Sequence, residues 1–110
     1  MTNDTYSLDV VIPCFNEEDT IPHTIPRLAS FLERLCENVE IHMDSFRLIL
    51  VDDGSKDTTW KIIENLATSH PILGVKLSRN YGHQNAMLAG LTCSDANAVL
   101  TIDADLQDDL

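Results

Sequence analysis

The amino-acid sequence predicts an α/β fold with a mainly parallel sheet. Short runs of aliphatic and β-branched residues alternate with segments of helical periodicity, which is typical of consecutive βαβ units. Each of the four expected strands is followed directly by polar residues. With 110 residues, 44% of them hydrophobic, and only 4 Gly and 4 Pro, the chain has the size and composition of one modest globular domain or of part of a larger one.

The first strand is expected at residues 8–13, where Pro13 ends it, and a helix follows from about residue 20 to residue 38. Pro22 suits the first turn of this helix, whereas Pro26 lies deeper in it. The helix has one apolar face, because hydrophobic side chains recur at helical spacing at Leu28, Phe31, Leu32 and Leu35.

The second strand is expected at residues 46–53. The helix after it has Asp57 or Thr58 as its N-cap, since both side chains can accept a hydrogen bond from the first turn. Its buried stripe consists of Trp60, Ile63 and Leu66 or Ala67.

The third and fourth strands, residues 72–78 and 97–103, flank a short helix at residues 82–94. We expect this helix to direct Met87, Leu88 and Leu91 toward the sheet. Right-handed crossovers make the successive strands parallel. We predict the spatial order 3-2-1-4, with helices on both faces of the sheet.

Polar clusters at the four strand ends predict a ligand site. The carboxyl ends of parallel strands meet along one edge of a sheet, and open α/β sheets bind ligands in the crevice outside that edge. Residues from distant parts of the chain should therefore converge there. The four clusters are Asn16–Glu17, Asp52–Asp53, Ser78–Arg79–Asn80 and Asp103–Ala104–Asp105.

Asp103 and Asp105 form a DxD pattern at the end of a buried strand. In an extended segment, side chains at i and i+2 point the same way, so two carboxylates face one spot. A divalent cation removes their repulsion, and Mg²⁺ and Mn²⁺ favour oxygen ligands. Gln107 offers a third oxygen. The alternative is a solvated acidic surface, but the buried strand in front of the pair favours a metal.

Asp52 and Asp53 end the second strand in "VDDGS". The carboxylate of Asp52 could accept hydrogen bonds from a nucleobase or a ribose hydroxyl. The alternative is an Asx-turn leading to a helix cap, and Asp53 is the better candidate for that local role.

The segment "SRNYGHQNA" places a cation and amides beside a glycine. Arg79 could offset diphosphate charge, and Asn80 and His83 could donate hydrogen bonds to a ligand. The alternative for the last two is a polar loop that caps the next helix.

Charge and cysteine content exclude several classes of protein. The net charge of −11 opposes binding of a nucleic-acid backbone, which depends on Lys and Arg. Three cysteines without a CxxC pair, Cys14, Cys36 and Cys93, give poor support for structural zinc or disulfides and are consistent with reduced thiols in the cytoplasm. The first ten residues lack the features of a secretory signal, and no apolar run approaches the roughly 18 residues of a membrane span.

Four linked motifs carry a resemblance to a known family: "VVIPCFNEE", "LILVDDGSKDTT", "SRNYGHQNAMLAGL" and "TIDADLQDD". Their order and spacing resemble family 2 glycosyltransferases with the GT-A fold. More narrowly, the chain is similar to bacterial polyprenyl-phosphate glycosyltransferases, relatives of dolichyl-phosphate mannose synthase. The resemblance covers residues 8–110, the donor-binding part, and leaves residues 1–7 as an N-terminal extension.

The resemblance implies an inverting transfer from a UDP- or GDP-linked sugar to polyprenyl phosphate or, as the alternative, to a saccharide acceptor. It also implies Mg²⁺ or Mn²⁺ on the donor diphosphate. By position, the nucleoside pocket is formed by Pro13, Phe15, Glu17, Leu50 and Asp52, the donor is met by Asp103, Ala104 and Asp105, and the metal is held by Asp105 with Asp103 and Gln107. Two residues depart from the family pattern: Cys14 stands where a small residue or Thr is usual, and Asp109 stands where a Pro is usual.

The family's acceptor-binding half would follow the DxD motif, so we expect a donor-binding half that is truncated and inactive alone. The full-length protein is expected to be anchored through later membrane helices, with its catalytic domain on the cytoplasmic face. A receiver domain is a remote alternative, because its paired acidic residues belong on the first strand, whereas in this chain they lie on the second. A dinucleotide-binding module is weaker still, because no GxGxxG follows the first strand.

Overall fold

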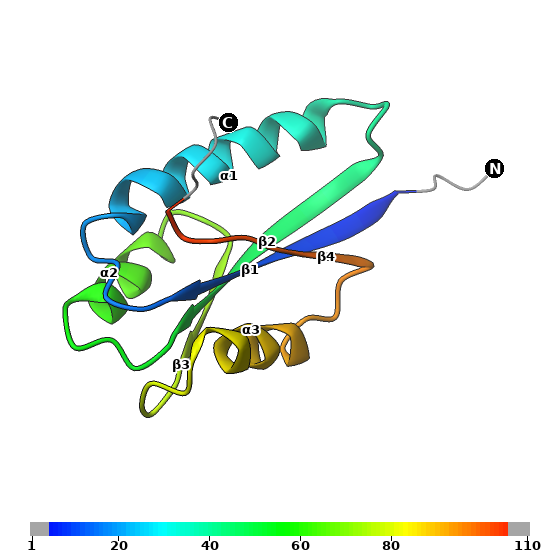
Figure 1. The fold of residues 1–110 in the computed structure, drawn as a ribbon. Helices are drawn as coiled ribbons and strands as arrows, with labels where there is room; N and C mark the ends of the chain where they lie inside the picture. Colours follow the sequence, from blue (N-terminus) through cyan, green and yellow to red (C-terminus); the bar gives the residue numbers. More distant parts are fainter. Residues whose placement is uncertain (1–4, 106–110) are drawn as a thin grey trace.

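The computed structural model describes residues 5–105, and these form a parallel sheet with helices on both faces (Figure 1). The strand order is β3-β2-β1-β4, and all three strand pairs are parallel, as predicted. The elements in chain order are β1 (Tyr6–Cys14), α1 (Ile21–Glu37), β2 (Met43–Asp52), α2 (Thr59–Leu66), β3 (Ile72–Lys76), α3 (His83–Thr92) and β4 (Ala98–Thr101).

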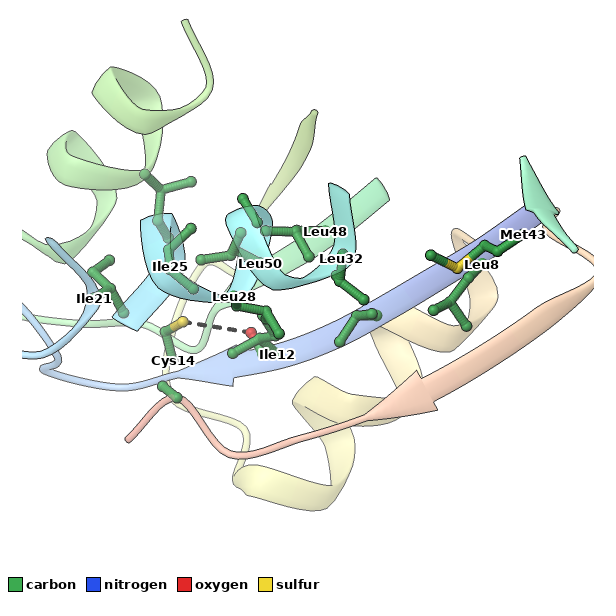
Figure 2. Packing of buried hydrophobic residues seen from close by; sticks show 14 residues of the cluster. Leu8, Ile12, Cys14, Ile21, Ile25, Leu28, Leu32, Met43, Leu48 and Leu50 are labelled. Carbon is green, nitrogen blue, oxygen red and sulfur yellow. Dashed lines mark hydrogen bonds between the residues drawn. The ribbon is translucent and has the colours of Figure 1, made fainter. Parts of the chain in front are cut away.

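The two central strands are buried on both faces, which explains their unbroken apolar sequence. Alternate residues of β1 and β2, such as Ile12 and Leu50, pack against α1 and α2 in the larger core cluster (Figure 2). The residues between them, such as Val11 and Val51, pack against Ala86 of α3. The strand ends are thereby fixed between two layers of helix.

The first two helices agree with the sequence prediction. Helix α1 carries Pro22 in its first turn and continues through Pro26. Its predicted apolar face is confirmed, with Leu28 and Leu32 buried and Phe31 and Leu35 packed against the same cluster. Helix α2 has Thr58 as its N-cap residue and buries Ile63, with Trp60 and Leu66 partly buried beside it.

The predicted inward face of α3 is wrong for Leu88 and Leu91, whereas Met87 is partly buried. Leu88 and Leu91 are 58% and 38% exposed, and the residues that α3 buries are Ala86 and Gly90. The reason is the short distance between α3 and the sheet: a Cβ atom on Gly90 would lie 2.4 Å from Cγ1 of Val11. Only the smallest residues fit at this contact, so the leucines turn away from it. Among the helices of residues 5–105, none is long and apolar enough to cross a membrane.

Candidate functional site: a cavity beyond the ends of β1 and β4

A cavity of about 340 Å³ lies beyond the carboxyl ends of β1 and β4. All four predicted polar clusters contribute to it, although they are far apart in the sequence. Its lining residues are Pro13, Cys14, Phe15, Glu17, Asp53, Asn80, Gly82, His83, Asp103, Ala104 and Asp105. The predicted convergence of the clusters at one edge of the sheet is therefore confirmed.

Six of the predicted donor-binding residues line this cavity, namely Pro13, Phe15, Glu17, Asp103, Ala104 and Asp105. The structure does not bring the other three to its wall. Leu50 is fully buried in the core, Asp52 is buried as the last residue of β2, and Arg79 is exposed on the loop before α3. The third predicted metal ligand, Gln107, lies outside the described residues.

The segment after β1 makes contacts that alternate from residue to residue. Phe15 and Glu17 line the cavity, whereas Asn16 and Glu18 bind the loop that precedes α2. Asn16 has a φ of 53°, a left-handed conformation that asparagine adopts more readily than most residues, and its Oδ1 accepts a backbone N–H of that loop at 2.9 Å. Oε1 of Glu18 accepts two further hydrogen bonds there. The hydrogen bonds of Asn16 and Glu18 thereby fix the segment whose other residues, Phe15 and Glu17, line the cavity.

Thr59, at the start of α2, completes this connection. Its buried hydroxyl accepts the backbone N–H of Glu17 at 2.8 Å and donates to Oδ1 of Asp57. Burial alone would raise the pKa of Asp57, but the hydrogen bonds from Thr59 and from the backbone of Glu18 and Asp57 together lower that pKa. Asp57 therefore stays ionised and orients the hydroxyl that fixes Glu17.

The prediction that Asp53 serves the local turn is wrong, because the two adjacent aspartates have the opposite arrangement. Oδ1 of Asp52 accepts the backbone N–H of Ser55 at 3.0 Å, which is the turn contact. Asp53 lines the cavity and accepts the backbone N–H groups of Tyr81 and Gly82. The sequence alone did not distinguish these two carboxylates.

Arg79 stacks on a neighbouring ring, with its guanidinium carbon 4.6 Å from the ring centroid of Tyr81. The phenol is also within hydrogen-bonding distance of Ser78, at 3.2 Å. The hydrogen bond with Ser78, together with Arg79, lowers the pKa of Tyr81. Arg79 is thus held beside the cavity and not on its lining.

Cys14, a departure from the family pattern, forms part of the cavity wall. Its thiol donates to the carbonyl of Ile12 at 3.4 Å (Figure 2). Burial, and to a lesser extent the charges of Glu17 and Asp52, raise the pKa of the Cys14 thiol well above its ordinary value. Cys14 is consequently a neutral packing group and not a nucleophile.

Asp103 and Asp105 give the cavity a carboxylate pair. Asp103 lies opposite His83, with Oδ1 3.7 Å from Nε2, a contact that is ionic only when the imidazole is protonated. Within residues 5–105 there is no group of three His, Cys, Asp or Glu side chains that could hold a metal by themselves. Two carboxylates nevertheless fit Mg²⁺ or Mn²⁺, which typically bind one or two protein carboxylates and complete their shell with phosphate and water.

A second cavity, of about 970 Å³, lies between α1 and the strands β1 and β4. It is larger, but its walls are mainly hydrocarbon, including Leu28, Phe31 and Leu100. Asp103 and Asp105 line it as well. We place the candidate site in the smaller cavity, because a polar ligand needs converging donors and acceptors and the smaller cavity provides them.

An open parallel sheet with a polar cavity beyond its strand ends is the arrangement in which α/β proteins typically bind their ligands. The family model described as glycosyl transferase family 2 matches residues 9–109. The chain therefore belongs to glycosyl transferase family 2. This membership removes the receiver-domain and dinucleotide-binding alternatives.

Similar proteins agree with this family. Over 106 residues the chain is 43% identical to the uncharacterized glycosyltransferase YkoT of Bacillus subtilis (strain 168), covering 94% of the chain and 31% of that protein. Over 103 residues it is 39% identical to the undecaprenyl-phosphate 4-deoxy-4-formamido-L-arabinose transferase of Proteus mirabilis (strain HI4320), covering 91% and 29%. The chain thus spans about three tenths of the length of these relatives.

Two solved structures share the fold. Residues 1–349 of TarS from S. aureus match with a TM-score of 0.72 and 24% identity, over 90% of this chain and 27% of that one. The mannosyltransferase PcManGT from Pyrobaculum calidifontis, solved with GDP-Man and Mn²⁺, matches with a TM-score of 0.73 and 20% identity, over 92% and 28%. At these identities the likeness establishes the GT-A fold and no more.

Proposed function

We propose that the chain is the donor-binding part of an inverting hexosyltransferase, which moves a sugar from a UDP- or GDP-linked donor to polyprenyl phosphate. The observation that carries this proposal is the convergence of all four polar clusters in one cavity beyond the strand ends. Membership of glycosyl transferase family 2 supports the reaction class.

In this proposal the nucleoside lies between β1 and the loop before α3. The exposed ring of Phe15 offers a flat apolar surface on which a base can stack. Glu17 supplies an acceptor for base or ribose hydrogens at the same wall. Leu50 and Asp52 contribute indirectly, Leu50 by packing β2 into the core and Asp52 by stabilising the turn after β2. Arg79 contributes from the loop before α3.

The donor diphosphate lies toward the segment after β4. Asp103 and Asp105 would hold Mg²⁺ or Mn²⁺, with Gln107 as a further oxygen ligand. When bound, the cation would offset the negative charge of the diphosphate as the nucleotide leaves. Ala104, between the two aspartates, is buried in the larger core cluster and keeps this segment against the core.

The acceptor is proposed from the relatives. Relatives named as undecaprenyl-phosphate sugar transferases match this chain at 36–39% identity, which favours a polyprenyl phosphate over a saccharide. Such an acceptor is already anionic, so its attack on the sugar needs little help from a general base. A whole protein with this acceptor would work at the cytoplasmic face of a membrane.

Calorimetric titration with UDP, GDP, UDP-N-acetylglucosamine and GDP-mannose, each with and without Mn²⁺, tests this proposal. We expect saturable binding of one nucleotide class, strengthened by Mn²⁺, and no binding of NAD or acetyl phosphate. Absence of binding by every nucleotide, with the chain folded, would refute the proposal.

Two matched variants decide which cavity takes the nucleotide. Phe15→Ala removes a ring from the polar cavity, and Phe31→Ala removes one from the apolar cavity. Loss of a stacked base costs about 1–3 kcal/mol, so Phe15→Ala should weaken binding about fivefold or more, and Phe31→Ala should leave it unchanged. The reverse pattern would place the ligand in the larger cavity.

A further inference from the structure

The turn after β2 is bonded to the loop before α3. The carboxylate of Asp53, which is 3% exposed, accepts the backbone N–H of Tyr81 with Oδ1 at 2.7 Å and that of Gly82 with Oδ2 at 3.1 Å. Each oxygen of this buried carboxylate thus accepts a hydrogen bond from one of two consecutive backbone amides. Hydrogen bonds to an ionised acceptor are among the stronger ones in proteins, so this contact fixes the position of the loop.

Gly54, the next residue, allows the two segments to approach this closely. A Cβ atom at residue 54 would lie 2.3 Å from both the carbonyl carbon of Arg79 and the backbone nitrogen of Asn80. Gly54 also has a φ of 70°, in the left-handed region that favours glycine. Any side chain here would push the loop away from the turn.

The loop held in this way forms one wall of the candidate site. Asn80, Gly82 and His83 line the polar cavity, and α3 begins at His83. The position of residues 78–82 relative to β2 therefore sets the shape of the cavity. The Gly82 amide also donates to Oδ1 of Asn80 at 2.9 Å, but that hydrogen bond stays within the loop and does not connect it to the sheet.

We propose that Asp53 and Gly54 are positioning residues, which hold residues 78–82 in the shape that binds the nucleotide before any ligand arrives. The inference rests on the proposed function for its nucleotide. Asp53 also lines the cavity, so a lost affinity in an Asp53 variant alone would not separate positioning from direct contact with the ligand. A Gly54 variant distinguishes the two roles, because glycine has no side chain that could contact a ligand.

Hydrogen exchange measured by NMR on the ligand-free chain gives the first readout. In Asp53→Asn, one oxygen becomes an amide NH₂ that faces an N–H donor, so exchange of the Tyr81 and Gly82 amides should accelerate roughly tenfold relative to amides of β1 and β2. Gly54→Ala should accelerate the same two amides. The amides of β1 and β2 correct for any change in global stability.

Nucleotide affinity gives the second readout. Both variants should weaken UDP or GDP binding by about tenfold in the absence of metal. Asp9→Asn is the matched control, because Asp9 is a buried aspartate of β1 whose partners, Arg47 and Ser94, lie away from the cavity. It should leave both the affinity and the Tyr81 and Gly82 amides unchanged.

Two results would overturn the positioning role. One is unchanged exchange at Tyr81 and Gly82 in Asp53→Asn together with lost affinity, which would make Asp53 a direct ligand contact. The other is full affinity in Gly54→Ala. If the wild-type chain binds no nucleotide, the proposed function fails and the nucleotide part of this inference fails with it, while the exchange data still decide whether Asp53 holds the loop.

Discussion

Asp9 and Arg47 face each other across the neighbouring strands β1 and β2, with Nη2 of the arginine 3.0 Å from Oδ2 of the aspartate. The Asp9 side chain is 5% exposed and that of Arg47 35%. Ser94, after α3, donates its hydroxyl to the same oxygen at 2.7 Å. The hydrogen bond to Asp9 raises the pKa of Arg47. This cluster ties two strands to the end of α3, away from the candidate site.

We expect Asp9→Ala to lower the free energy of unfolding by about 1–3 kcal/mol, because two donors lose a buried, charged acceptor. Asp95→Ala is the control: Asp95 meets the same arginine at 3.6 Å but is 96% exposed. Exposed pairs contribute little, so this change should cost about 0.5 kcal/mol or less. Urea denaturation compares the two variants, and equal losses would contradict the special role of Asp9.

Gly90→Ala should destabilise the chain although alanine is the better helix former. The gain in helix propensity is at most about 1 kcal/mol. Against it, the new Cβ would lie 2.4 Å from Val11 and 2.9 Å from Val51, two buried side chains of the central strands. Overpacking of this kind typically costs about 1–3 kcal/mol. Leu88→Ala, on the exposed face of α3, serves as the control in thermal unfolding, and a Gly90→Ala chain as stable as wild type would refute the tight packing.

The strands of the sheet could be predicted from the sequence because their signal is local, but the expected burial of the fourth strand is wrong, since β4 is an edge strand with three of its four residues exposed. Strands buried on both faces need unbroken apolar runs, and β1 and β2 have them. The buried face of α3 could not be predicted in this way. It depends on how closely the helix approaches the sheet, and Ala86 and Gly90 permit an approach that the hydrophobic pattern of Leu88 and Leu91 does not reveal.

The candidate site was predicted in outline for the same reason, since strand order brings the strand ends together. The roles of Asp52 and Asp53 were not, because adjacent residues of one type differ only in the direction in which the backbone points them. A signal was present in Gly54, whose lack of a side chain indicates a close approach by another segment. That segment, residues 78–82, could not be identified without the structure.

Asp52→Asn and Asp52→Ala together test the turn. Asn keeps an oxygen that can accept the N–H of Ser55. The free energy of unfolding should therefore stay close to that of wild type, and nucleotide affinity within about twofold. Ala removes the acceptor in a buried position and should cost about 1–3 kcal/mol of stability. Denaturation and calorimetry are the measurements. A direct contact with the nucleotide would show instead as lost affinity in Asp52→Asn at unchanged stability.

Thr59→Val should loosen the wall of the cavity while keeping the shape of the core. Valine matches threonine in size but leaves the backbone N–H of Glu17 without its acceptor, at a cost of about 1–3 kcal/mol. Nucleotide affinity should fall as well, because Glu17 lines the cavity. Thr68→Val is the control, since Thr68 is exposed and its hydroxyl bonds only within its own turn. A variant with normal affinity would show that the wall does not depend on Thr59.

Asp105→Asn tests the metal. The amide keeps the shape of the carboxylate but removes one charge from the Asp103 and Asp105 pair that we assign to the cation. We therefore expect the strengthening of nucleotide binding by Mn²⁺ to fall at least about tenfold, since the loss of one ligand should cost no less than the loss of an outer-shell partner. Affinity measured in EDTA should hardly change, because the nucleoside contacts are elsewhere in the cavity.

The control for this variant must carry the same change in net charge. Asp95→Asn does so at an exposed site beside Arg47, and it should leave both affinities as they are. Calorimetry with UDP or GDP then measures the affinity of each chain in Mn²⁺ and in EDTA, and the ratio of these two affinities is compared between chains. Because free metal binds weakly to two carboxylates without phosphate oxygens, Mn²⁺ alone should give little heat in either chain. A ratio that survives Asp105→Asn unchanged would remove Asp105 from the metal site.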